Sequence, residues 1–175
     1  MILTGDEIRK QVTTKRITIE PFDQRFITTN SYDFHLGGSL LVYENKILDV
    51  KVRNKTKTIK LTSSGYVLQP DKIYLGHTQE HLGSEHYVPI IRGKSSTGRI
   101  GLFVHITADL IDIGSVNQYT LMLYGVQPVR VYPGMLIGQV TFWEVKGEIK
   151  QLYNGKYKNL SGPQPSQIFR DFPID

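Results

Sequence analysis

Residues 93–99 carry the side chains best suited to bind a phosphorylated ligand. They read Gly-Lys-Ser-Ser-Thr-Gly-Arg, so hydroxyls and basic groups stand in a turn that glycines flank. Backbone amides, hydroxyls and a guanidinium can together hold a polyphosphate, because each donates hydrogen bonds to anionic oxygens. The segment is not a Walker loop, since that motif needs a glycine where this chain has Val88. A basic surface turn would have the same composition, so both interpretations stay open from these residues alone.

Asp112 is the strongest single candidate for a reactive side chain. It lies between Ile111 and Ile113, and Gly114 follows. A carboxylate next to a turn glycine either caps the turn by accepting backbone hydrogen bonds or acts as a positioned base. The local sequence is compatible with both roles.

No pattern in the chain indicates a metal site made by the protein itself. There are no cysteines, which excludes disulfides and the cysteine ligands of a zinc-dependent deaminase. His77, His81 and His86 lie near one another, but we find no acidic partner for them at metal-binding spacing. His105 falls in an expected interior strand, where we predict a hydrogen-bonded core group rather than a catalyst.

Length and charge point to one domain of 175 residues that acts on a small anionic ligand. The formal charge of +5 suits a polyphosphate as well as a nucleic acid, and the basic residues are scattered except in 53–60, which we interpret as a solvated hairpin. No apolar run approaches the ~18 residues of a membrane span, and the N-terminus has no signal-peptide pattern. We therefore expect a cytoplasmic protein with no nucleic-acid or membrane partner.

Short β-rich runs between turn signals predict an all-β sandwich or barrel. A helix is expected at 6–12, opened by Thr4 as its cap with Glu7 three residues later. Strands are expected at 17–20, 40–43, 58–61, 66–68, 73–78, 87–92, 102–107, 119–124, 129–131 and 138–145. Residues 154–175 are rich in Gly, Pro, Lys and Gln, which is typical of a disordered tail or of an arm that orders on a ligand.

The order of several motifs resembles that of the dCTP deaminase family, a branch of the trimeric dUTPase superfamily. These motifs are residues 30–37, 93–102, 105–108, 111–114 and 132–139. The resemblance implies a mainly β, dUTPase-like distorted jelly-roll (β-clip) barrel with a short N-terminal helix. It also implies a homotrimer with sites between subunits. In a single domain of residues 1–175, residues 1–150 would form the core and 151–175 an arm that closes over the nucleotide.

The same resemblance implies roles for individual residues. The positions that match phosphate-binding residues of the family are Lys94, Ser95, Ser96, Arg99, Tyr153, Lys156 and Tyr157. Asp112 matches an aspartate that contacts the deoxyribose and, in the dUTPase branch, orients the attacking water. The backbone at Ala108 matches the segment that binds the pyrimidine edge, and Gln139 matches a buried glutamine that supports the site. Lys94 replaces the usual arginine. This change keeps the positive charge but loses the planar guanidinium, which can bind an anion through two parallel hydrogen bonds.

Three departures from the family pattern affect the deaminating apparatus. Met122 stands where the family has the glutamate that moves protons during deamination. Leu160 replaces a glutamine of the arm, and residues 115–117 replace an aromatic residue and a glycine. A thioether cannot exchange protons, so these changes weaken the expectation of deamination and leave the phosphate-binding residues in place.

We therefore expect, first, a dUTP diphosphatase that forms dUMP and pyrophosphate with little or no deamination of dCTP. Mg²⁺ would be its cofactor, bound mainly through the triphosphate of a deoxyuridine or deoxycytidine nucleotide. The alternatives are a dCTP deaminase that forms dUTP and ammonia, with another residue in place of the glutamate, and a non-catalytic nucleotide-binding regulator.

Overall fold

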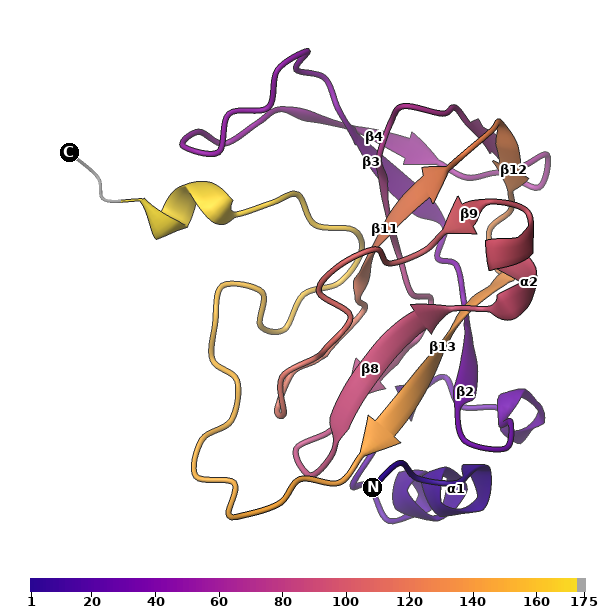
Figure 1. Ribbon diagram of the computed structural model, residues 1–175, viewed down its shortest axis with the longest axis vertical. Coiled ribbons are helices and arrows are strands. Elements are labelled where there is room, and N and C mark those ends of the chain that lie inside the picture. Colours follow the sequence, from indigo (N-terminus) through magenta and orange to yellow (C-terminus); the bar gives the residue numbers. More distant parts are fainter. Residues whose placement is uncertain (173–175) are drawn as a thin grey trace.

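The computed structural model describes residues 1–172 of the chain (Figure 1). The helical elements are α1 (Gly5–Thr13), α2 (Ser95–Arg99) and the 3-10 turns η1 (Gln24–Phe26) and η2 (Ile168–Asp171). The strands are β1 (Thr18–Glu20), β2 (Tyr32–His35), β3 (Ser39–Tyr43), β4 (Thr56–Lys60), β5 (Tyr66–Leu68), β6 (Tyr74–His77), β7 (His81–Gly83), β8 (Val88–Gly93), β9 (Leu102–Phe103), β10 (Val116–Asn117), β11 (Thr120–Gly125), β12 (Val129–Val131) and β13 (Leu136–Trp143). The prediction of a mainly β protein with a short N-terminal helix is confirmed.

The strands pair antiparallel in four open sheets within the described residues. Their strand orders are β1-β7-β10, β4-β3-β6-β11-β9, β12-β5 and β2-β13-β8. Two central strands organise the molecule: β11 pairs with β6 and β9, and β13 pairs with β2 and β8. The amide of Glu7 donates to the Thr4 hydroxyl at 3.3 Å, so the predicted cap begins α1.

Strand β11 lies between the core and a cavity, and its successive side chains point alternately to one and to the other. Leu121 and Leu123 are completely buried in the core, whereas Met122 and Tyr124 are half-buried on the opposite face. Successive side chains of a strand point to opposite faces, so one strand presents an apolar face inward and a second face to the cavity. The continuous apolar sequence of β11 therefore does not mean that both faces lie in a core.

Several expected elements differ from those observed. Strand β2 was not expected because Asp33 interrupts its apolar pattern, and this carboxylate is buried through an ion pair with Lys94. Strands β7 and β10 have three and two residues, too few to give a periodic signal. The strand expected at 102–107 ends at Phe103, and His105 lies in the irregular segment that follows.

The segment after β13 runs along one side of the molecule without strand pairing (Figure 1). Its last three residues, 173–175, fall in the predicted arm but lie outside the described residues. Within residues 1–172, no helix has the length and apolar character that a membrane crossing requires.

Two substitutions in β11 test the assignment of its faces. Leu121→Ala should lower the free energy of unfolding by about 2–5 kcal/mol, since it leaves a cavity in a close-packed core. Met122→Ala is the matched control and should cost less, because this side chain borders an existing cavity. Urea unfolding followed by circular dichroism measures both values. An equal loss for the two variants would contradict the assignment.

Candidate functional site

A cavity of about 530 Å³ opens beside the face of β11 that carries Thr120 and Met122. Its walls come from the end of β3, from β6 and β11, from the segment 105–119 and from the C-terminal segment 153–166. A more open groove of about 730 Å³ adjoins it and is lined by residues 110–113 and 151–155. Volumes of this size hold small-molecule ligands such as a nucleotide. The two spaces share Asp112 and Tyr153 in their walls, so they form one candidate site.

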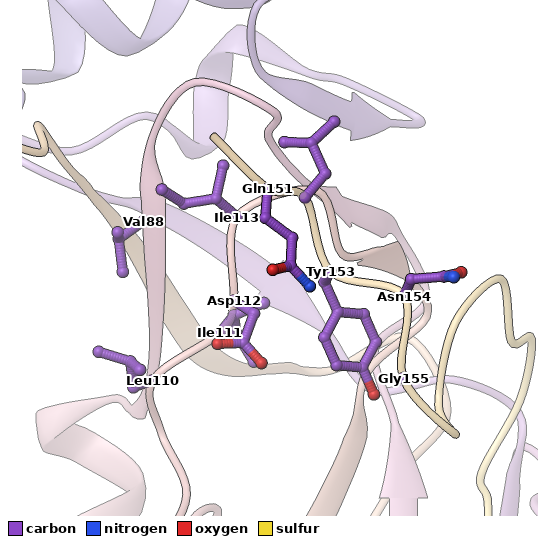
Figure 2. A pocket seen from close by; sticks show the side chains of 10 residues that line it. Val88, Leu110, Ile111, Asp112, Ile113, Gln151, Tyr153, Asn154 and Gly155 are labelled. Carbon is purple, nitrogen blue, oxygen red and sulfur yellow. The ribbon is translucent and has the colours of Figure 1, made fainter. Parts of the chain in front are cut away.

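Asp112 lies where the cavity and the groove meet (Figure 2). The turn around it is closed by backbone bonds, since the Ser115 amide donates to the Asp112 carbonyl at 3.1 Å and the Gly114 amide to the Ser84 carbonyl at 2.8 Å. Within residues 1–172 the carboxylate accepts no hydrogen bond from this turn. The turn-cap alternative is therefore excluded for this structure, and an exposed carboxylate remains for a ligand.

The segment between β9 and β10 brings His105 and Ala108 into the cavity wall. Ala108 has φ 60°, in the left-handed region, and its carbonyl oxygen accepts a hydrogen bond from His105 Nε2 at 2.9 Å. His105 Nδ1 is buried and has no hydrogen-bond partner. Burial lowers the pKa of His105 below its ordinary value, so the neutral imidazole prevails near neutral pH.

The C-terminal segment is held over the cavity by side chains that sequence reasoning did not select. Asn117, itself buried, donates from Nδ2 to the Tyr157 carbonyl at 3.0 Å and accepts at Oδ1 from the Leu160 amide at 2.7 Å. Gln118 Oε1 accepts from the Gly162 amide at 2.8 Å. The structure therefore shows an arm bound to the core rather than a separate tail. The sequence marked residues 115–117 only as a departure from the family pattern, because the hydrogen bonds of Asn117 to the arm depend on the tertiary fold.

Tyr119 supports the turn that presents Asn117. Its hydroxyl donates to the Ser115 carbonyl at 2.7 Å, and Ser115 Oγ accepts from Asn117 Nδ2 at 2.9 Å. Burial raises the pKa of Tyr119, which keeps the phenol protonated as a donor. The residues that depart from the family pattern at 115–117 thus form a connected polar network under the arm.

The predicted phosphate-binding residues fall in two separate places. Tyr153 and Tyr157 line the cavity, and Lys156 lies beside them in an ion pair with Asp171 at 2.5 Å. Ser95, Ser96 and Arg99 are exposed on α2 and line neither the cavity nor the groove. In Figure 1, α2 lies to the right of β8, whereas the chain that follows β9 runs to the left. One chain therefore does not bring α2 to Asp112.

Lys94 and Gln139 also lie away from the cavity. The Lys94 ammonium pairs with Asp33 in a mostly buried contact, so it is already occupied by a carboxylate. Gln139 is on β13, opposite Asp33 and Arg92 in the sheet register, and it is half-buried rather than buried as expected.

Comparison with known proteins agrees with the motifs. A family model described as dCTP deaminase-like matches residues 2–145. The chain belongs to this family. A protein of Clostridium beijerinckii is 48% identical over 172 residues, which cover 98% of this chain and 99% of that protein. Relatives from Hathewaya histolytica and Cytophaga hutchinsonii are 46% and 41% identical over the same length. All three are named "dCTP deaminase, dUMP-forming".

A solved structure of 2'-deoxycytidine 5'-triphosphate deaminase from Agrobacterium tumefaciens has the same fold. The TM-score is 0.64 at 21% identity, over 81% of this chain and 47% of that one. The expectation of a plain dUTP diphosphatase is wrong, because the full-length relatives carry the name of a deaminase. The departures at Met122, Leu160 and residues 115–117 concern a few positions, whereas these relatives match 98% of the chain.

The bonds of Asn117 predict how firmly the arm is held. Asn117→Ala should speed amide hydrogen exchange of residues 153–167 about thirtyfold, since two bonds to the arm backbone are lost at roughly 1 kcal/mol each. Mass spectrometry of exchanged peptides measures this rate. Lys158→Ala is the control on the arm itself, because Lys158 contacts only Asn154 in the hydrogen bonds described. Unchanged exchange in Asn117→Ala would show that other contacts hold the arm.

Proposed function

We propose that this protein is a dCTP deaminase that forms dUMP. The observation that supports this most directly is 41–48% identity over nearly full length to relatives of that name. The size and lining of the cavity agree with this proposal. An apolar wall with Asp112, Asn117 and two arm tyrosines suits a pyrimidine nucleotide. The reaction consumes dCTP and two waters and yields dUMP, ammonia and pyrophosphate.

The two halves of this reaction have different chemical needs. In the first, water adds at C4 of the pyrimidine and ammonia leaves, which requires proton transfers at the ring. In the second, water attacks the α-phosphorus and pyrophosphate leaves. The exposed carboxylate of Asp112 would orient and deprotonate that second water, a role supported by its place in the walls of both the cavity and the open groove.

Magnesium would accompany the triphosphate and reduce the charge on its oxygens. The side chains present fit a metal that is held mainly by the ligand, because the groove offers the one exposed carboxylate of Asp112 among described lining residues that are otherwise uncharged. The contribution of the chain would be the Asp112 carboxylate, which can accept a hydrogen bond from a water of the metal.

A second chain would complete the site. The exposed hydroxyls and guanidinium of Ser95, Ser96 and Arg99 suit a triphosphate, yet they line neither the cavity nor the groove that Asp112 borders. Near α2 stand exposed apolar side chains, with 50% exposure at Ile100, 46% at Phe103 and 61% at Val126. Contact with a neighbouring copy would cover this surface and bring α2 to the neighbour's cavity, as in a homotrimer.

Product analysis with dCTP and Mg²⁺ tests the proposed reaction. We expect dUMP, pyrophosphate and ammonia in equal amounts, measured by chromatography and an enzyme-coupled ammonia assay. Asp112→Asn should lower dUMP formation ~10²–10⁴-fold with nucleotide affinity nearly kept, because the amide cannot accept a proton. Asp6→Asn, on α1, is the control. Tight dCTP binding without any product would instead favour the non-catalytic regulator.

Mixing two inactive variants tests whether the site is shared between chains. Arg99→Ala and Asp112→Asn should each lose activity alone. When the two are co-expressed in equal amounts and assemble at random, about a quarter of the sites over all trimers combine an intact Arg99 with an intact Asp112 from different chains. We expect about a quarter of wild-type activity. Each variant chain lacks one residue, so a site built within one chain would give no recovery.

A further inference from the structure

The proposed deamination needs a group that moves protons at the base, and Met122 provides none. Met122 lies on the cavity face of β11, where its thioether sulfur is at most a weak hydrogen-bond acceptor. If the protein deaminates dCTP, another side chain of the cavity must therefore perform this task. Besides Asp112 and four tyrosines, the titratable side chain in the described cavity wall is His105.

His105 and Met122 line the same cavity. Strand β9 pairs with β11 so that Phe103 is opposite Tyr124 and Leu102 opposite Gly125. His105 follows two residues after Phe103, in the irregular segment that leaves this pair of strands. A titratable side chain thus lies in the cavity wall to which Met122 also belongs.

The hydrogen bonds of His105 fix its tautomer. A carbonyl oxygen only accepts, so the bond at 2.9 Å to the Ala108 carbonyl requires a proton on Nε2. Nδ1 of the neutral ring therefore carries a lone pair, and this buried atom has no hydrogen-bond partner. Buried polar atoms without partners are uncommon and costly, by about 1–3 kcal/mol. A ligand that donates to Nδ1 would remove this cost.

The surroundings also accommodate the protonated ring. The Val104 and Ala108 carbonyls and the charge of Asp109 favour the imidazolium, whereas burial favours the neutral form. Burial is the largest of these influences and lowers the pKa of His105, so the ring rests in the neutral form that can accept a proton from water. Phe103 is the last strand residue before this segment, so residues 104–108 can shift without breaking a strand ladder. Such a shift is needed, because Nδ1 is buried.

We propose that His105 is the catalytic residue that transfers protons during deamination, in the place of a carboxylate at position 122. This role rests on the proposed function. Nδ1 takes a proton from water as the water oxygen bonds to C4, and delivers it to N3 of the ring. It then takes the proton of the new hydroxyl at C4 and gives it to the amino group. The C4–N bond breaks, ammonia leaves, and the imidazole is neutral again.

The decisive variant is His105→Gln, whose side-chain amide can still donate to the Ala108 carbonyl but cannot exchange a proton. We expect ammonia release from dCTP to fall ~10²–10⁴-fold. Formation of dUMP from added dUTP should fall far less than ammonia release, because Asp112 serves that half of the reaction. Thermal unfolding checks the fold of the variant, and His105→Asn provides a second substitution without a titratable ring.

Asp112→Asn separates the two half-reactions. It should impair dUMP formation from dUTP more strongly than ammonia release from dCTP, whereas His105→Gln should do the reverse. Wild-type rates of ammonia release in His105→Gln, or a loss of ammonia release that is greater in Asp112→Asn than in His105→Gln, would overturn the role of His105. A wild-type protein that binds dCTP and releases no ammonia would overturn the proposed function itself, and the two failures are thus distinguishable.

Discussion

Strand β11 is hydrogen-bonded on both edges, to β6 and to β9, and this double pairing fixes the direction of every side chain in the cavity wall. A shift of one residue would exchange the faces of the strand and expel Leu121 and Leu123 from the core. The hydrophobic core therefore determines the register. The register in turn determines that Thr120 and Met122 face the ligand space and that His105 follows on the adjacent segment.

The cavity is made from segments that are distant in the sequence. Thr120 and Met122 come from a strand, Asp112 and His105 from the irregular segment before it, and Tyr153 and Tyr157 from the arm. Strands supply rigid positions and loops supply the polar groups, a division of roles common in binding sites. The arm adds the last wall by means of Asn117, Gln118 and Thr120, whose side chains bind it over a span of several residues.

Much of this arrangement could be predicted from the sequence. Turn signals and β-branched runs predicted the mainly β fold, Thr4 predicted the start of α1, and the motif order identified the family. Asp112 could also be selected as a candidate from the sequence, because the turn glycine that follows at Gly114 is visible in the local pattern without knowledge of the tertiary fold. Its separation from α2 was not predictable from local pattern, since it depends on how four sheets pack. His105 was placed wrongly because the apolar run after Leu102 suggested a longer strand than the two residues observed.

The arm is recognised through its main chain, and this constrains its sequence in an unusual way. Core side chains accept hydrogen bonds from the amides of residues 160, 162, 164 and 166, every second residue of the segment. The two prolines of this segment, Pro163 and Pro165, occupy the intervening positions, where no amide is used. A proline has no N–H, so moving either one by a single residue would remove a bond to the core. Side chains along the arm are otherwise free to diverge, which explains how leucine is accommodated at position 160 without loss of the contact.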